Sequence, residues 1–238
     1  MRSTFFLFLM TVLFTCLTAG PAQAKKEELP QVTTDGLHLV PDSRMAIVYA
    51  APGAELAPYN RVILLDAYVA FKKNWERDQK LQSHSTSLSS REITRIKDSL
   101  TAEFREVFST ALIEAGYELT DEPGDDVMIV RPAIINLDVN APDRMSAGRV
   151  TTYAASAGEM TLYVELWDSV SGDIMAKALD RRVDNAHSGY YTWTNSVSNR
   201  AAAIRILKGW AEILITALNE ARPVQEAQTG DADPANPG

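Results

Sequence analysis

The chain has little cysteine, little histidine and no excess of positive charge, and each shortage excludes a class of protein. One cysteine occurs among 238 residues, which excludes a disulfide scaffold, a zinc ribbon and an iron–sulfur cluster held by the cysteines of one chain. Lysine and arginine number 23 against 31 aspartates and glutamates, a net charge of −8, so bulk charge does not drive binding to nucleic acid. At 46% hydrophobic residues, the chain is composed like an ordinary folded protein.

The motifs that bind nucleotides or activate a nucleophile are also missing. The sequence has no G-x-x-x-x-G-K-[ST] loop, no G-x-G-x-x-G turn, no G-x-S-x-G elbow and no H-E-x-x-H helix. Its three histidines are His38, His84 and His187, and we expect them to be solvated. We therefore predict no catalytic residue and no cofactor, while a hydrolase that uses His187 with Ser188 stays open as an alternative.

Acidic residues form two short pairs, Asp125 with Asp126 and Asp180 with Asp184. Neither pair follows the every-second-residue ligand pattern of a calcium loop. The first follows a proline–glycine turn, and the second surrounds two arginines with which it is expected to form surface ion pairs. We predict no bound metal, and the second pair remains the other candidate for a hydrolase site.

The N-terminus has the pattern of a secretory signal peptide. Residues 1–24 carry one charge, Arg2, followed by an apolar run from Phe5 to Leu17 that is too short to cross a bilayer. Small residues at Ala22 and Ala24 suit a signal peptidase, so we predict cleavage after Ala24. The mature protein is then soluble in the periplasm.

The single cysteine, Cys16, raises the alternative of a lipoprotein anchored to the outer membrane. The box before it reads Leu13-Phe14-Thr15, whereas lipoprotein boxes have small residues in the last two of these places. We therefore disfavour lipidation at Cys16, and we expect contact with a membrane only if that lipid is present.

The mature chain is predicted to hold one domain with loosely held ends. Residues 25–30 are charged and end in proline, so they are expected to be flexible. Residues 222–238 form an acidic tail rich in proline, and they are predicted to be disordered. Residues 31–221 between them show no internal repeat and no linker, which favours a single domain.

Two long amphipathic helices are predicted. From Arg91 to Ala115 apolar residues recur at spacings of three and four, Ser89 and Glu92 form a capping box, and Gly116 ends the helix. The second helix runs from about Val197 to Ala221. Its predicted apolar face comprises Val197, Ala201, Ile204, Leu207, Ala211, Leu214 and Leu218.

The remaining patterned segments are predicted strands. They are Met45–Ala50, Arg61–Ala67, Tyr117–Leu119, Val127–Val139, Glu159–Trp167 and Ile174–Val183. The last two form a hairpin around Gly172. Alternation in the first of them places five residues away from the core, namely Glu159, Thr161, Tyr163, Glu165 and Trp167. Pro132 should make its strand bulged or place it at an edge. We predict an α+β fold, a two-layer sandwich in which both helices cover one face of a mixed, mostly antiparallel sheet.

Two connections are candidates for function. The segment Asn185–Asn195 carries Tyr190, Tyr191 and Trp193 among small polar residues, with Arg181 and Arg182 nearby at the end of the preceding strand. These five residues form a candidate site for a partner if the aromatic rings are exposed, although the rings could instead close the end of the core. The segment Asn140–Gly158 is either a long functional loop or an extension of the next strand.

Several segments, in order, carry a resemblance to a known family. They are LLDAYVAFKKNW (Leu64–Trp75), RPAIINLDVNAPD (Arg131–Asp143), SAGEMTLYVELWDSVSGDI (Ser156–Ile174), DRR (Asp180–Arg182) and WTNSVSNR (Trp193–Arg200). Together they resemble the bacterial family called domain of unknown function 3313. The resemblance implies an exported protein of Gram-negative bacteria, of a family often classed as candidate lipoproteins, and it brings no catalytic residues.

These observations favour a non-enzymatic protein of the cell envelope. We expect it to bind another envelope protein, or to assemble with itself, through the open face of the sheet or the Tyr190–Trp193 loop. A hydrolase acting on envelope material is the first alternative, and a carrier of a small ligand is the second.

Overall fold

The structure of the protein is a computed structural model that describes residues 29–82, 89–139, 153–154, 158–183, 192–193 and 196–221. Several predictions fall outside these residues and stay predictions. They concern the signal peptide with Cys16 and Ala24, the loop residues Tyr190 and Tyr191, and the tail of residues 222–238.

The first predicted helix is confirmed as α2 (Ser90–Glu114). The Ser89 hydroxyl accepts a hydrogen bond from the Glu92 backbone N–H at 3.3 Å, and the Glu92 carboxylate accepts one from the Ser89 N–H at 2.8 Å. This is the predicted capping box. Gly116 follows the helix with a φ of 86°, in the left-handed region that favours glycine.

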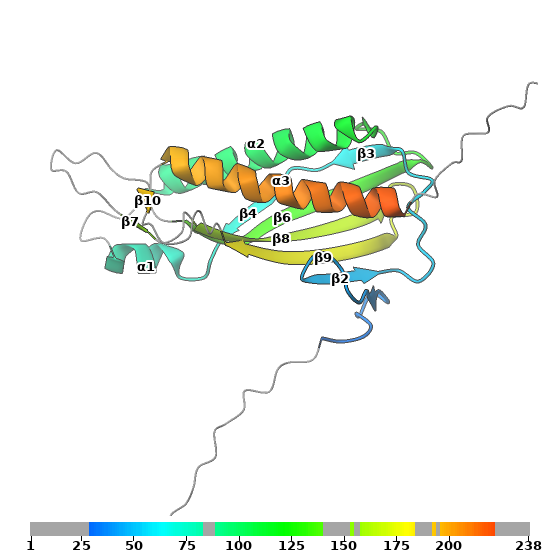
Figure 1. The fold of residues 1–238 in the computed structure, drawn as a ribbon, viewed down its shortest axis with the longest axis horizontal. Helices are drawn as coiled ribbons and strands as arrows, with labels where there is room; N and C mark the ends of the chain where they lie inside the picture. Colours follow the sequence, from blue (N-terminus) through cyan, green and yellow to red (C-terminus); the bar gives the residue numbers. More distant parts are fainter. Residues whose placement is uncertain are drawn as a thin grey trace, which may run out of the picture. The chain divides into compact units, whose positions relative to one another are not determined.

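The second predicted helix is confirmed as α3 (Ser196–Glu220), but part of its predicted apolar face is wrong. Ala201 is exposed, whereas Ile206 and Trp210, which were not assigned to that face, are buried. Because α3 has apolar residues on more than one side, spacing alone did not select the buried side. Figure 1 shows α2 and α3 running side by side, and an ion pair of 2.5 Å joins Arg200 of α3 to Glu103 of α2.

A short helix, α1 (Trp75–Gln82), was not predicted. Its sequence is mostly polar, so it lacks the apolar stripe from which a helix is recognised. Trp75 fixes its start, because this side chain is 2% exposed and its indole Nε1 donates a hydrogen bond to the Val139 carbonyl at 3.0 Å. Asn74, just before it, has a φ of 67° that turns the chain into the helix.

The strands form a mixed sheet in the order β1-β2-β9-β8-β6-β3-β5, with β4 also paired to β6. The bounds are β1 (His38–Leu39), β2 (Ile47–Ala50), β3 (Arg61–Leu64), β4 (Tyr68–Phe71), β5 (Glu118–Leu119), β6 (Val127–Val139), β8 (Gly158–Asp168) and β9 (Ile174–Val183). The predicted hairpin is confirmed as β8 and β9. A separate pair joins β7 (Tyr153–Ala154) to β10 (Thr192–Trp193). The α+β class and the mixed sheet are therefore confirmed.

Pro132 lies in the middle of β6, which has partners on both sides, so the edge alternative is wrong. β6 pairs with β3 as far as Val130 and with β4 from Ala133 onward. Pro132 thus falls between two partner strands, where a missing N–H is better tolerated than within a continuous ladder. The pairing of β6 with β8 shifts register, as at a β-bulge, between Ile135 and Asp138, three residues or more after Pro132.

Asp180 connects β9 to the core side of α3. The residue is 8% exposed, and its carboxylate accepts hydrogen bonds from Trp210 Nε1 at 2.8 Å, Arg182 Nε at 3.0 Å and the Ala46 backbone N–H at 3.1 Å. The predicted ion pair is present between Asp180 and Arg182, but its predicted surface location is wrong, because the carboxylate is buried and shared among three donors. A buried carboxylate is stable only with such partners.

We predict that Asp180→Ala lowers the free energy of unfolding by about 3 kcal/mol, because it leaves buried donors without an acceptor. Urea unfolding at pH 7 measures the change. Asp98→Ala removes an exposed carboxylate of α2, and this control should change stability by less than about 0.5 kcal/mol. Equal effects of the two substitutions would contradict a structural role for Asp180.

A second carboxylate, Asp168 at the end of β8, makes stability depend on pH. It accepts hydrogen bonds from Tyr59 Oη at 2.6 Å and from the Ser171 backbone N–H at 2.6 Å. The bond from Tyr59 is the main reason that the pKa of Asp168 falls to about 2. Since an unfolded aspartate has a pKa of about 3.9, this carboxylate stabilises the fold above about pH 4, and the contribution is lost as the pH falls toward 2.

Tyr59→Phe should therefore lower the free energy of unfolding at pH 7 and raise the pKa of Asp168. The deficit relative to the unsubstituted protein should shrink between pH 4 and pH 2, where the carboxylate becomes protonated. Urea unfolding across this range measures the deficit, and NMR titration of the Asp168 carboxyl carbon measures the pKa. A deficit that is constant with pH would show that Tyr59 acts by packing alone.

Candidate functional site

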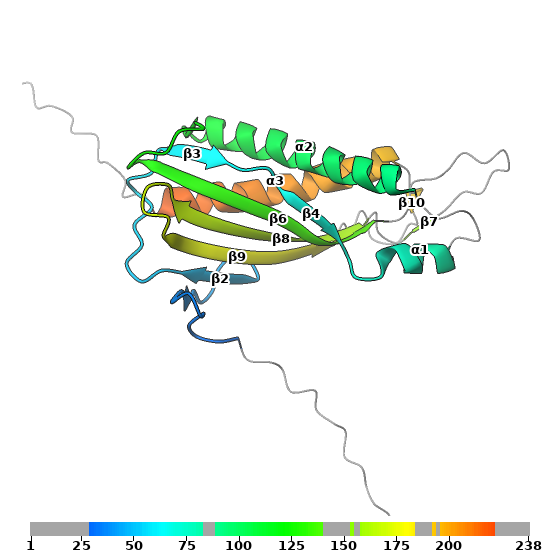
Figure 2. The ribbon, with the colours of Figure 1, turned by 180° about the vertical axis from the view of Figure 1, so that it is seen from behind.

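One face of the sheet carries the side chains that alternate with the core residues of β6 and β8. Met128, Val130 and Ile134 of β6 are buried in the core, as are the even-numbered residues of β8 from Met160 to Leu166. We call the opposite side the outer face. Its members used below are Tyr68, Arg131, Glu159, Tyr163, Glu165, Trp167 and Arg181. Figure 2 shows β6, β8 and β9 from the side away from α3.

Glu165 organises the centre of the outer face. Its carboxylate accepts hydrogen bonds from Tyr163 Oη at 2.5 Å and Trp167 Nε1 at 3.1 Å, and it lies 3.6 Å from Arg131 Nη1. Burial, followed by the hydrogen bond to Glu165, raises the pKa of Tyr163, so this phenol remains a hydrogen-bond donor at neutral pH. The two aromatic side chains are thus held in place by one carboxylate.

In two ion pairs of the outer face, the carboxylate is much less exposed than the arginine. The Glu165 side chain is 12% exposed, whereas that of Arg131 is 65% exposed. The same arrangement recurs where Arg181, 59% exposed, pairs with Glu159, 21% exposed. In these two pairs the carboxylate is covered and the guanidinium group is exposed, whereas in the pair of Lys177 with Asp35 on the same face the lysine is the less exposed partner.

Exposed apolar groups flank these arginines. Tyr68, at the start of β4, is 67% exposed. Trp167 and Ile174 pair across β8 and β9 and are partly exposed, and Ile129 pairs with Trp167 from the other side. Aromatic and arginine side chains of this kind are enriched at protein interfaces.

The structure separates the residues of the sequence-predicted partner site. Arg181 points to the outer face, whereas Arg182 pairs with Asp180 on the core side, because successive strand residues point to opposite faces. Trp193 lies in β10, with its backbone opposite Tyr153. Tyr190 and Tyr191 lie outside the described residues, so the binding role of that loop stays a prediction.

Of the hydrolase candidates, only Asp180 lies among the described residues, so neither candidate pair is tested. His38 is exposed in β1, Asp180 is shared among three donors, and His84, Asp184, His187 and Ser188 lie outside the described residues. Among the residues described, no group of three histidine, cysteine or acidic side chains could hold a metal ion. None of the helices described has both the length and the hydrophobicity to span a bilayer.

Alternation in the sequence of β8 placed Glu165 outward together with Tyr163 and Trp167. Sequence reasoning missed Arg131 and Tyr68 as members of the same surface. Arg131 and Tyr68 could be added only once the register of β6 with β8 and β4 was known.

Solved structures with low identity align over much of the chain. A PelC dodecamer from Paraburkholderia phytofirmans is 12% identical, with 68% of this chain and 96% of that chain covered and a TM-score of 0.32. A minor lipoprotein from Acinetobacter baumannii is 10% identical, with 67% and 94% covered and a TM-score of 0.31. A DUF4136 family protein from Bacteroides thetaiotaomicron is 11% identical, with 72% and 95% covered and a TM-score of 0.33.

No curated protein matches the chain. A family model, described as protein of unknown function (DUF3313), matches residues 37–214. That span runs from the residue before β1 into α3 and includes every strand of the outer face. The resemblance seen in the sequence is thereby confirmed, and the chain belongs to the DUF3313 family.

Proposed function

We propose that this protein is a non-enzymatic binding module of the cell envelope, and that its outer face docks a protein partner. The partner presents carboxylates beside apolar side chains. The observation that carries the proposal is the ion pair of Glu165 with Arg131, which holds a guanidinium group outward among partly exposed aromatic rings.

Charge complementarity selects the partner. Arg131 and Arg181 project, while the carboxylates that pair with them are mostly buried, so carboxylates of a partner would meet two accessible guanidinium groups. A symmetric contact between two copies would place these guanidinium groups against each other, which is unfavourable. The proposal therefore favours a different, acidic protein over self-association.

A two-layer fold would leave this face free, and we propose that arrangement with both long helices on the other face. Trp210 of α3 bonds to Asp180 on the core side of β9. Thr101 of α2 donates to the Ala67 carbonyl, between β3 and β4. Side chains of both helices also share one hydrophobic cluster with the core residues of β6 and β8.

The envelope location is part of the proposal and is supported by the N-terminal pattern. Arg2, the short apolar run and Ala24 fit an exported precursor. A partner would then be a periplasmic protein or the periplasmic part of a membrane protein.

The docking surface can be tested by photocrosslinking in cells. With p-benzoylphenylalanine in place of Tyr68, ultraviolet light should give an adduct with one acidic envelope protein, identified by mass spectrometry. Arg131→Glu combined with Arg181→Glu should reduce the adduct yield roughly tenfold, because reversal of charge repels the partner's carboxylates. Arg91→Glu with Arg95→Glu, on the exposed side of α2, makes the same change in net charge and should leave the yield unchanged.

Three results would overturn this proposal. One is an adduct at Tyr68 that consists of two copies of this chain, which would assign the face to self-association. Another is an adduct yield no higher than that from the same probe at Ile113, an exposed residue of α2. The last is an equal loss of adduct from the two pairs of substitutions.

The N-terminus of the mature protein tests the proposed location. Intact mass measured on soluble and membrane fractions of cells should show a chain that begins at Lys25, recovered with the periplasmic fraction. A diacylated or triacylated Cys16 in the membrane fraction would contradict the soluble form and place the docking face next to a membrane.

A further inference from the structure

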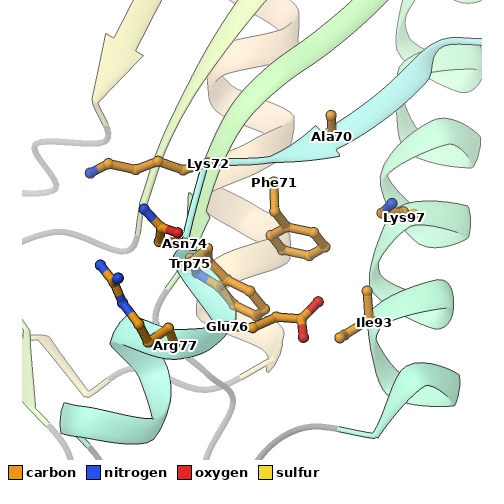
Figure 3. Close-up of a pocket in the computed structure, with 9 residues that line it drawn as sticks. All are labelled: Ala70, Phe71, Lys72, Asn74, Trp75, Glu76, Arg77, Ile93 and Lys97. Carbon is orange, nitrogen blue, oxygen red and sulfur yellow. The ribbon is translucent and has the colours of Figure 1, made fainter.

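A cleft of about 540 Å³ lies away from the centre of the outer face, where the end of β4 meets the first turns of α1 and α2. This volume is within the range of about 300–1,000 Å³ that is typical of small-molecule sites. Figure 3 shows that Phe71 and Trp75 occupy its centre. Five of its lining residues, from Ala70 to Trp75, lie in the segment Leu64–Trp75 that carries the family resemblance, and the sequence assigned no role to them.

An aromatic pair forms the floor of this cleft. The rings of Phe71 and Trp75 stack with their centroids 4.1 Å apart and an angle of 22° between their planes. The hydrogen bond from Trp75 Nε1 to the Val139 carbonyl holds the pair in position. Since Trp75 is buried and Phe71 is partly exposed, Phe71 is the ring available to a ligand, with Ile93 of α2 across from it. The floor is therefore flat, apolar and rigid.

Cationic side chains border this floor. Lys97 of α2 places its Nζ 5.9 Å from the centre of the Phe71 ring. Arg77 of α1 lies on the other side of the aromatic pair in Figure 3, where its exposed guanidinium group is 3.5 Å from the Asp78 carboxylate. Lys72 also lines the cleft, but its charge is balanced by Asp138 at 3.0 Å. No ion pair joins Lys97 to any residue that the structure describes, so Lys97 is the best placed cation for an incoming anion.

One carboxylate, that of Glu76, also lines the cleft. Lys72 and Arg77 are paired with carboxylates beside the cleft, at 3.0 Å for Asp138 and 3.5 Å for Asp78. Lys97 is therefore the cation that attracts a ligand with a negative group, and Glu76 repels that ligand. Removing the charge of Lys97 and removing that of Glu76 should therefore change the affinity for an anion in opposite directions, which would not be expected of a purely apolar cleft.

We propose that this cleft binds an anionic amphiphile, a carboxylate, sulfonate or phosphate joined to a flat or extended apolar body. The apolar body lies on Phe71 beside Ile93, and the anionic group meets Lys97. A free aromatic acid and an anionic lipid share this chemistry. The site is separate from the docking of a protein on the outer face, so either proposal can fail without the other.

The test uses the full-length protein and the fluorescent dye 1-anilinonaphthalene-8-sulfonate, an aromatic sulfonate. Titration should show saturable binding at one site. Lys97→Met should weaken the dye roughly two- to fivefold, because it removes a partly solvated ion pair, and Glu76→Gln should strengthen it by a similar factor. Lys208→Met, at an exposed position of α3, is the matched control and should leave the affinity unchanged. N-phenyl-1-naphthylamine, which lacks the sulfonate, should respond to neither charge change.

Competition identifies the source of the anion. If monomeric 2-naphthoate displaces the dye, the ligand class is a free aromatic acid. If only lysophosphatidylglycerol displaces it, the ligand class is an anionic lipid. Either result supports the proposal. Failure of both competitors would overturn it. So would weaker dye binding in Glu76→Gln, which would indicate a cationic ligand, or equal effects of Lys97→Met and Lys208→Met. Circular dichroism of each variant establishes that the changes do not come from unfolding.

Discussion

Asp180 accepts hydrogen bonds from three parts of the chain, and the positions of the sheet edge and of α3 depend on it. Ala46 binds it just before β2, Arg182 binds it within β9, and Trp210 binds it from α3. A buried carboxylate without these donors would be strongly unfavourable, so the three segments must meet in one arrangement. Apolar packing by itself tolerates small shifts of a helix over a sheet, whereas three directed hydrogen bonds tolerate few. The carboxylate thus specifies where α3 lies, and the hydrophobic cluster supplies most of the stability.

On the outer face, covered carboxylates also fix the positions of hydrogen-bond donors, but here the donors they hold are partly exposed to solvent. Glu165 and Glu159 are mostly covered, and each lies beneath an arginine that reaches into solvent. Their negative charge holds the guanidinium groups and the aromatic hydroxyl in fixed positions and leaves cationic and apolar groups at the surface. In an acidic chain this leaves two guanidinium groups exposed on the outer face. The cleft beside Phe71 likewise has one cation, Lys97, that is joined to no carboxylate among the described residues.

Much of the fold could be predicted because its signals are local. The capping box of Ser89 and Glu92, the glycine after α2 and the alternation of β8 each depend on residues within a few positions of one another. α1 was missed because it is short and polar and is held by the contact of Trp75 with Val139, 64 residues away in the sequence. Pro132 was misread for a related reason: whether a proline is tolerated in a strand depends on the neighbouring strand, which the sequence around it does not describe.

For the candidate sites, the residues by themselves determined the class of protein, the family and the outward orientation of Tyr163 and Trp167. These follow from composition, motifs and the period of a strand, which need no knowledge of long-range contacts. Only the tertiary structure decided that Glu165 meets Arg131, that Arg181 and Arg182 serve opposite faces, and that Phe71, Trp75 and Lys97 border one cleft. Strand register and helix placement bring these groups together, and both depend on the packing of segments far apart in the chain.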